Sequence, residues 1–307
     1  MHDLVIIGGG PAGIAAAVYA ARKRLSSIVI AEEVGGQSKV SEGIENWIGT
    51  PIISGADLAR SLHNHLEAVK GDVVTLALGE RAVSLKKKDG VFSVATQSGR
   101  KFTARAVLVA SGASRRKLTI PDADTFEHKG LTYCASCDGP LFAGSDVAVI
   151  GGGNAGFETA LQLLAYAKSV TLINRGTEIK ADPITVEKAR AHPHMRIITN
   201  VDPIRVVGDR FVAGLIYANK ASGETTTLAV SGIFVEIGVL PNTDFAAELL
   251  ELDEVRRVKT DPRSQRTSVE GVWAAGDCTD ELYHQNNIAA GDGVKALEDI
   301  YLWLKRR

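Results

Sequence analysis

The 307-residue chain contains three cysteines, few aromatic residues and no long apolar run. Three cysteines are too few for the disulfide framework of a small secreted domain. No stretch approaches the about 20 apolar residues that a membrane-spanning helix requires. The chain begins with Met1-His2-Asp3 and a short apolar run, without the basic segment that precedes the core of a signal peptide. We therefore expect a cytoplasmic protein that makes no membrane contact.

Charge of one sign is also missing. Lys and Arg total 35 and Asp and Glu total 36, which gives a net charge of −1, and no basic block stands out. A nucleic-acid partner is therefore not expected. A metal site is not expected either. The pairs His63-x-His65 and His192-x-His194 could each supply two ligands, but no thiolate or carboxylate partner is apparent, and two ligands do not make a site.

Glycine, in contrast, is arranged in a pattern that occurs twice. Gly8-Gly9-Gly10-Pro11-Ala12-Gly13 recurs as Gly151-Gly152-Gly153-Asn154-Ala155-Gly156. Each copy lies between a short apolar strand and an Ala-rich apolar segment, and a second apolar strand follows. In such a turn the first glycine allows the tight bend, the second admits a pyrophosphate to the backbone, and the third lets helix pack on strand. The repeat predicts two βαβ units, with strands at 4–7 and 27–31 and at 147–150 and 169–173.

The residue at the end of the second strand of each unit separates the two predicted nucleotide sites. In the first unit this residue is Glu32, whose carboxylate can accept a hydrogen bond from a free ribose 2′-hydroxyl, as FAD requires. In the second unit the corresponding positions are Asn174 and Arg175, with Lys180 further along. Because a cationic side chain suits a 2′-phosphate, the second site favours NADPH over NADH.

The remaining segments predict how the domains are organised. Residues 73–111 and 196–238 alternate in hydrophobicity between turn signals, and Lys88-Asp89-Gly90 in the first segment predicts a hairpin. Each nucleotide unit is therefore expected to carry a small sheet of its own. The apolar strand at 271–275 must return to the first domain to complete its sheet. The predicted fold class is α/β, with two Rossmann-like nucleotide-binding domains of the three-layer ββα type, the second inserted in the first. The predicted boundaries are 1–113 with 244–307 for the FAD-binding domain and 114–243 for the NAD(P)H-binding domain.

The pair Cys134-Ala-Ser-Cys137 is the strongest chemical signal in the chain. In a cytosolic protein, a Cys-x-x-Cys pair without further metal ligands is typical of a redox couple. Asp138 follows at once, and a neighbouring carboxylate can shuttle the proton that a leaving thiolate needs. Asp138 before Gly139-Pro140 is equally typical of a simple turn. Cys278 is far away in sequence, and we expect it to pack in the core rather than react.

These motifs together resemble the low-molecular-weight thioredoxin reductases and the flavoprotein part of the alkyl hydroperoxide reductase flavin subunit. The resemblance covers nearly the whole chain. The segments that carry it are Gly8 to Gly13, Gly35-Gly36-Gln37, Glu45-Asn46-Trp47, Cys134 to Pro140, Gly151 to Gly156, Gly276-Asp277-Cys278 and Gln285.

The resemblance implies an enzyme that uses FAD and NADPH or NADH, acts on thioredoxin or a thioredoxin-like protein, and forms a homodimer. It implies that hydride passes from the nicotinamide to the flavin, that Cys137 faces the flavin, and that Cys134 attacks the protein substrate. Asp138 would donate or accept the proton. With the glycine motifs, the implied FAD contacts are Gly8, Gly10, Pro11, Ala12, Gly13, Glu32, Gly36, Gln37, Asn46, Gly112, Gly276, Asp277 and Gln285. The implied nicotinamide contacts are Gly151, Gly153, Asn154, Ala155, Gly156, Asn174, Arg175 and Lys180.

The chain departs from the family pattern at the donor site. NADPH-using members carry His-Arg-Arg followed three residues later by Arg, whereas this chain reads Asn174-Arg175-Gly176 and then Lys180. Lys lacks the bidentate fork of Arg. NADH-using relatives place Glu at the Asn174 position, so the chain matches neither type. NADPH, NADH and ferredoxin therefore stay open as donors, and a redox-sensing flavoprotein without disulfide turnover is the alternative to an enzyme.

Overall fold

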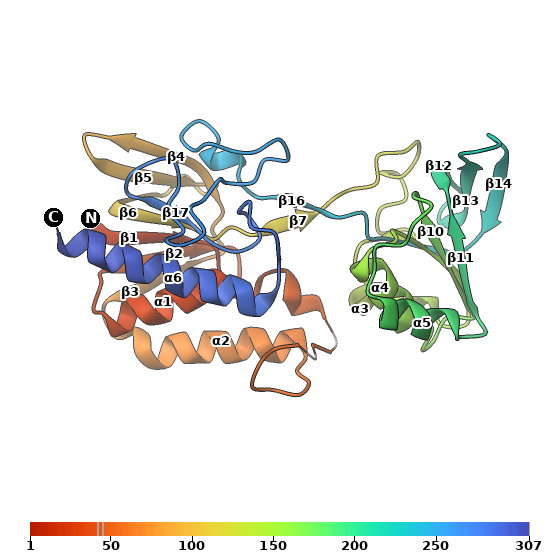
Figure 1. Cartoon of the computed structure of the whole chain (residues 1–307), viewed down its shortest axis with the longest axis horizontal. Helices are drawn as coiled ribbons and strands as arrows, with labels where there is room; N and C mark the ends of the chain where they lie inside the picture. Colours follow the sequence, from red (N-terminus) through yellow and green to blue (C-terminus); the bar gives the residue numbers. More distant parts are fainter. Residues whose placement is uncertain (42, 45, 307) are drawn as a thin grey trace. The chain divides into compact units, whose positions relative to one another are not determined.

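The computed structural model describes residues 1–41, 43–44 and 46–306, apart from the side chains of Ser136 and Cys137. Glu45, the first residue of the Glu45-Asn46-Trp47 motif, therefore lies outside the described residues. The chain divides into two compact units. Unit 1 comprises Met1–Ser114 and Leu240–Arg307, and unit 2 comprises Arg115–Val239 (Figure 1).

Unit 1 is built on a seven-stranded sheet in the order β3-β2-β1-β6-β5-β4, with β17 paired to β6. The central strands are parallel, and Ile6 of β1 lies opposite both Val29 and Leu108. All five residues of β2 are buried, as expected for a parallel strand with both faces covered. The strands are β1 (His2–Ile7), β2 (Ser27–Ala31), β3 (Val74–Leu78), β4 (Ala82–Lys88), β5 (Val91–Thr96), β6 (Lys101–Val109) and β17 (Val272–Ala274).

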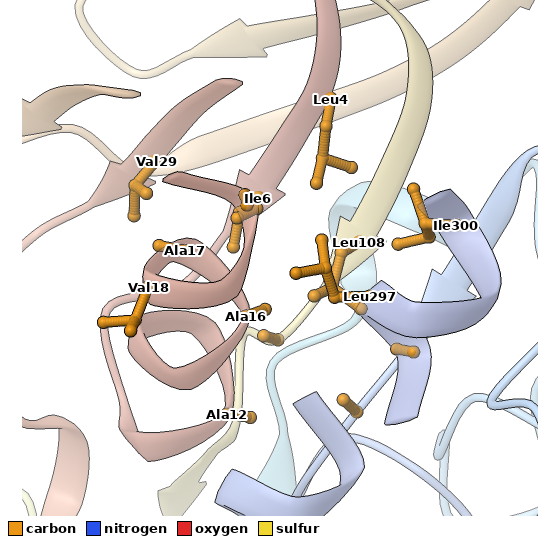
Figure 2. Close-up of a cluster of buried hydrophobic side chains, with 14 of the residues drawn as sticks. Leu4, Ile6, Ala12, Ala16, Ala17, Val18, Val29, Leu108, Leu297 and Ile300 are labelled. Atoms are coloured by element: carbon orange, nitrogen blue, oxygen red, sulfur yellow. The ribbon is translucent and has the colours of Figure 1, made fainter. Parts of the chain in front are cut away.

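Three helices lie on one face of this sheet (Figure 1). Small residues let two of them approach closely, because a Cβ added to Gly293 would lie 2.1 Å from the carbonyl oxygen of Ala12. Figure 2 shows Ala16 and the α6 residue Leu297 in the same apolar cluster as Leu108 of β6. The helices are α1 (Pro11–Arg22), α2 (Gly55–Lys70) and α6 (Asn286–Lys305), and the 3-10 helices of unit 1 are η1 (Gly36–Val40) and η3 (Asp244–Ala246).

The prediction that unit 1 carries a separate small sheet is wrong in one respect. Strands β4 and β5 form the predicted hairpin, with Asp89 and Gly90 at positive φ in its turn. However, β5 also pairs with the first half of β6, whose second half pairs with β1 and β17. The long strand β6 thus joins both sets of strands into one sheet. Phe92 and Val94 of β5 pack with Val5, on the face opposite to α1.

Unit 2 has the predicted three layers. Its parallel sheet has the order β11-β10-β9-β15-β8, and a separate antiparallel sheet has the order β12-β13-β14. One apolar cluster lies between the two sheets, and another lies between the parallel sheet and the helices. The strands are β8 (Leu131–Thr132), β9 (Asp146–Ile150), β10 (Ser169–Asn174), β11 (Met195–Thr199), β12 (Val201–Gly208), β13 (Val212–Asn219), β14 (Thr225–Ala229) and β15 (Gly232–Val235). The helices are α3 (Ala135–Asp138), η2 (Gly139–Phe142), α4 (Asn154–Leu163) and α5 (Pro183–Arg190).

Two short strands connect the units. β7 (Ala113–Arg115) and β16 (Val239–Pro241) pair with each other where the chain enters and leaves unit 2. Beyond them, β17 returns to the sheet of unit 1, as the apolar strand near its position predicted. The α/β fold class with parallel, Rossmann-like sheets is confirmed. Within the described residues, no helix combines the length and apolarity needed to cross a bilayer.

Candidate functional site

The first glycine-rich turn connects β1 to α1 and leaves an open helix N-terminus. Gly8 has φ +122°, and a Cβ on it would lie 2.0 Å from the oxygen of Ala110. A Cβ on Gly13 would lie 2.0 Å from the oxygen of Gly8, so both positions require glycine for packing. Helix α1 has Gly10 at its N-cap without a side-chain cap, Pro11 at its start and no acidic residue in its first turn. The first backbone amides of α1 can therefore donate hydrogen bonds to a bound anion.

Gly10 faces a second glycine-containing loop. Gly36 has φ +64°, and a Cβ on Gly36 would lie 3.2 Å from the Cα atom of Gly10. The two backbones thus approach each other without intervening side chains, and the exposed Gln37 follows Gly36. Glu32 is exposed directly after β2, and its carbonyl oxygen accepts a hydrogen bond from the amide of Gly79 at 3.1 Å. Glu32 therefore lies where the sequence predicts a ribose contact.

Asn46 and Gln285, the two predicted flavin contacts, lie together at the start of α6. The amide Nδ2 of Asn46 donates to Oε1 of Gln285 at 3.0 Å. Asn287 donates from Nδ2 to the carbonyl oxygen of Asn46 at 2.6 Å, and Ser38 donates to Oδ1 of Asn286 at 2.7 Å. The start of α6 thus holds the loop that follows η1. Sequence reasoning missed Asn286 and Asn287, because no motif distinguishes them from other helix-start residues.

Gly276 and Asp277 form a turn beside the starts of α1 and α6. Gly276 has φ +75°, and a Cβ there would come within 3.2 Å of both Ala12 and Ala289. Oδ1 of Asp277 lies 3.6 Å from Nδ1 of His284, and both side chains are half-buried. Interaction with the Asp277 carboxylate raises the pKa of His284, against the opposing effect of burial.

The predicted contact Gly112 lies just before β7. It has φ +63°, and no heavy atom lies within 4 Å of where its Cβ would be. Its carbonyl oxygen accepts a hydrogen bond from the amide of Asn242 at 2.9 Å.

The second glycine-rich turn, in unit 2, repeats the geometry of the first. Gly151 has φ +137°, and a Cβ on it would lie 2.0 Å from the oxygen of Glu236. A Cβ on Gly156 would lie 2.0 Å from the oxygen of Gly151, whereas a Cβ on Gly153 would meet nothing within 4 Å. Gly153 is the N-cap of α4 and supplies no side-chain cap. Two glycines are therefore required by packing, and the middle one faces open space before a helix N-terminus.

Asn154 and Asn174 brace the loop that follows β10. Oδ1 of Asn154 accepts from the amide of Asp182 at 2.7 Å, while the next residue, Ala155, is exposed. Nδ2 of Asn174 donates to the carbonyl oxygens of Gly176 and Glu178, both at 2.9 Å. The amide of Asn174 is thus committed to the loop backbone.

Arg175 and Lys180 belong to this loop. Two further charged residues contact Arg175, one on β12 and one directly after β13. Nε of Arg175 lies 2.6 Å from Oδ1 of Asp202 on β12, and the Arg175 side chain is 78% exposed. Nζ of Lys220 donates to the carbonyl oxygen of Arg175 at 3.5 Å. The amide of Lys180 donates to the oxygen of Gly152 at 3.2 Å. Sequence reasoning missed Asp202 and Lys220, because only tertiary pairing brings them to this loop.

The cysteine motif forms the one-turn helix α3 at the end of β8. Cys134 is disulfide-bonded, and the side chain of its predicted partner, Cys137, lies outside the described residues. The amide of Asp138 donates to the oxygen of Cys134 at 3.2 Å and closes the turn. The Thr132 hydroxyl accepts from the amide of Cys134 at 3.2 Å and donates to Oδ2 of Asp138. Thr132 connects the backbone of Cys134 to the predicted proton carrier, a contact that sequence reasoning missed.

The third cysteine has the environment of a packing residue. Cys278 is fully buried, and its Sγ atom donates to the carbonyl oxygen of Val109 at 3.5 Å. Burial raises the pKa of the Cys278 thiol, which disfavours the reactive thiolate. Among residues 1–41, 43–44 and 46–306, no three His, Cys, Asp or Glu side chains gather in a group that could hold a metal ion.

The chain matches known proteins over nearly its whole length. The model of the family described as pyridine nucleotide-disulphide oxidoreductase matches residues 2–293. The chain is 39% identical over 306 residues to the F subunit of alkyl hydroperoxide reductase from Escherichia coli K12, covering 99% of this chain and 58% of that protein. It is 38% identical over 304 residues to an NADH dehydrogenase of Bacillus subtilis strain 168, with coverages of 99% and 59%. The chain thus spans about three fifths of the length of these curated relatives.

Among solved structures, the thioredoxin reductase of Lactococcus lactis in its FR conformation superimposes with a TM-score of 0.95. It is 31% identical in sequence, and the match covers 100% of both chains.

Proposed function

Because the chain belongs to the pyridine nucleotide-disulphide oxidoreductase family, we propose that it is a thioredoxin-disulfide reductase. In this proposal two electrons pass from a nicotinamide nucleotide to the Cys134-Cys137 pair and then to a disulfide in a thioredoxin-like protein. The observation that carries the proposal is the combination, in unit 2, of an open nucleotide turn with a disulfide-bonded cysteine whose backbone is linked to a carboxylate.

The family implies FAD, and the residues of unit 1 fit it. The α1 N-terminus and the facing Gly10 and Gly36 offer a backbone cradle for a pyrophosphate. Glu32 would accept from the ribose, and Asp277 would bind the ribityl or pyrophosphate part. Asn46 and Gln285 would orient the ring through the amide pair that they form. When bound, the flavin would supply the two-electron chemistry that connects a nicotinamide to a disulfide.

Unit 2 fits the nicotinamide nucleotide that the family also implies. The α4 N-terminus behind Gly153 has no side-chain cap and no acidic residue in its first turn, so its amides can receive a second pyrophosphate. The loop after β10, with Arg175 and Lys180, would lie at the adenosine ribose.

The cysteines and Asp138 would perform the exchange with the partner protein. The Cys134 thiolate attacks one sulfur of the partner disulfide, that S–S bond breaks, and the leaving sulfur takes a proton. The thiol of Cys137 then displaces the partner from Cys134, so this chain is oxidised to its disulfide and the partner is reduced to a dithiol. Asp138 would give and receive the protons. Substrate and catalyst exchange two electrons and two protons in total.

A peroxide-reductase partner is the second candidate for the acceptor. The observation that favours it is the 39% identity to the E. coli alkyl hydroperoxide reductase protein, which exceeds the 31% identity to the L. lactis thioredoxin reductase. Both candidates use the same cysteines, so they differ in the partner protein and not in the chemistry.

An anaerobic titration of the purified flavoprotein tests the proposal. We expect NADPH or NADH to bleach the flavin absorbance within seconds, and oxidised thioredoxin to restore the colour. Reduced ferredoxin serves as the third donor, and an oxidised peroxiredoxin as the alternative acceptor. Recovery only with the peroxiredoxin would identify the second candidate. If no protein disulfide restored the colour, the reductase assignment would be wrong and a redox sensor would be favoured.

Asp202 gives a prediction about donor choice. Its carboxylate pairs with Arg175 and partly neutralises this cation, which follows the end of β10 where a 2′-phosphate is expected. The negative charge of Asp202 would therefore repel a 2′-phosphate, whereas the ribose hydroxyl of NADH is uncharged and would not be repelled. We expect Asp202→Asn to tighten NADP⁺ binding by about threefold to tenfold at low salt, with NAD⁺ binding unchanged.

Titration calorimetry with NADP⁺, NAD⁺ and 2′,5′-ADP measures this effect directly. Asp146→Asn is the matched control, because it also removes a carboxylate paired with a basic residue, Lys168, in unit 2. Asp146 is the first residue of β9, and the glycine turn follows the other end of this strand. Weaker NADP⁺ binding in Asp202→Asn would instead show that Asp202 orients Arg175 for the phosphate.

A further inference from the structure

Thr132 occupies a fixed position beside the redox cysteine. It is the last residue of β8, lies opposite Phe234 of β15, and is 5% exposed. The chain then turns into α3, so only Tyr133 separates Thr132 from Cys134. The backbone of Thr132 is therefore fixed by the sheet, and its side chain is held in a buried setting.

The hydroxyl of Thr132 makes two hydrogen bonds of opposite sense. It accepts from the backbone amide of Cys134 at 3.2 Å and donates to Oδ2 of Asp138. A hydroxyl has one donor and two acceptor positions, so one acceptor position is left after these two bonds. If Asp138 takes up a proton, its O–H can donate to Thr132 without any movement of heavy atoms. Thr132 can thus hold the carboxyl group in both protonation states.

Simple capping of α3 does not account for this arrangement. An N-cap needs only an acceptor for the free backbone amide at the helix start. The Thr132 hydroxyl already meets this need, because it accepts from the amide of Cys134. The second bond instead fixes the carboxylate at the other end of a four-residue helix. The side chain that would carry the proton is thereby tied to the main chain of the cysteine that would be reduced.

We propose that Thr132 is a positioning residue for proton transfer at the redox pair, acting by holding the Asp138 carboxyl group against the backbone of Cys134. This inference rests on the proposed function, because it assigns Asp138 the role of proton carrier. Thr132 itself exchanges no proton with the sulfurs.

Reduction by a small dithiol isolates the step. One thiolate of dithiothreitol attacks a sulfur of the disulfide that contains Cys134, the protein S–S bond breaks, and the departing sulfur takes a proton. The second thiol of dithiothreitol then displaces the remaining protein sulfur, which is also protonated. Dithiothreitol ends as a cyclic disulfide and the protein as a dithiol. This assay needs neither a nicotinamide nor a partner protein.

The test compares Thr132→Val with Thr132→Ser in the full-length holoprotein. Valine keeps the shape and removes the hydroxyl, whereas serine keeps the hydroxyl. We expect the rate of reduction by dithiothreitol, followed by thiol trapping, to fall about tenfold in Thr132→Val and to stay within about twofold in Thr132→Ser. Bleaching of the flavin by the nicotinamide donor should be equal in all three proteins. Thr132→Ala replaces Thr132→Val if the latter does not fold.

A double-mutant cycle with Asp138→Asn separates positioning from folding. If Thr132 acts through Asp138, adding Thr132→Val to Asp138→Asn should slow the reaction no further. Independent, multiplicative losses would overturn the proposal, as would equal rates in Thr132→Val and the wild type or equal losses in the valine and serine variants. A wild type that reduces no protein disulfide would count against the proposed function alone, because the dithiothreitol assay would still report on Thr132.

Discussion

Replacement of Cys134 by serine is expected to lower the reduction of a thioredoxin-like partner by about a thousandfold or more, because a hydroxyl neither ionises near neutral pH nor forms the S–S bond that carries the electrons. Bleaching of the flavin absorbance by the nicotinamide donor should continue in the variant, because Cys134 is not among the predicted contacts of either nucleotide. Stopped-flow absorbance measures the bleaching, and a coupled thiol assay with the partner measures the turnover. The variant therefore separates the two halves of the reaction.

Two further cysteine variants test the same assignment. Cys137→Ser should also abolish turnover, since one sulfur alone cannot close the intramolecular disulfide. Cys278→Ala is the control, because Cys278 is fully buried, and burial raises the pKa of its thiol. It should retain turnover. Undiminished reduction of the partner by Cys134→Ser would remove the basis for the reductase assignment.

Adding a methyl group to the middle glycine of each turn is expected to disable one nucleotide site at a time. A Cβ on Gly10 would have Gly36 as its nearest neighbour, at 3.9 Å, and a Cβ on Gly153 would meet nothing within 4 Å. Both residues also have negative φ, so alanine brings no backbone strain. Each methyl group would, however, stand where the pyrophosphate needs to approach the backbone.

We expect Gly10→Ala to weaken FAD binding by about a hundredfold, corresponding to about 2.8 kcal/mol, and Gly153→Ala to weaken nicotinamide nucleotide binding by a similar factor. Gly10→Ala should leave unit 2 able to bind the nicotinamide nucleotide, and Gly153→Ala should retain its flavin. Flavin fluorescence after gel filtration reports the first binding step, and titration calorimetry reports the second.

Two other glycines supply control variants for this experiment. Gly291 is exposed in α6, and an added methyl group there would have no heavy atom within 4 Å. Gly291→Ala should therefore preserve both affinities and raise the melting temperature slightly, because alanine favours the helix more than glycine does. Gly13→Ala should unfold unit 1 or lower its stability, because the added Cβ would lie 2.0 Å from a backbone oxygen. Full FAD retention by Gly10→Ala would show that the pyrophosphate does not lie at the α1 N-terminus.

The elements that depend on short stretches of chain could be predicted from the sequence. The two glycine turns, the strands beside them and the hairpin at Asp89-Gly90 follow from backbone geometry and alternating burial, which act over a few residues. The insertion of one unit in the other follows from chain order. The Cys134-Cys137 spacing predicts a redox couple for the same local reason, since both residues belong to one turn of chain.

Only the tertiary structure determined which residues far apart in sequence come into contact and where individual side chains point. The Asn46–Gln285 pair joins positions 239 residues apart, and Asp202 reaches Arg175 only because β12 lies in a second sheet. The joining of β5 to the main sheet depended on the length of β6. Thr132 is close in sequence to Cys134, yet its role depends on where a buried hydroxyl points, and composition and spacing do not specify that direction. Local backbone preferences act between neighbouring residues, whereas partners in a folded site are selected by packing of the whole chain.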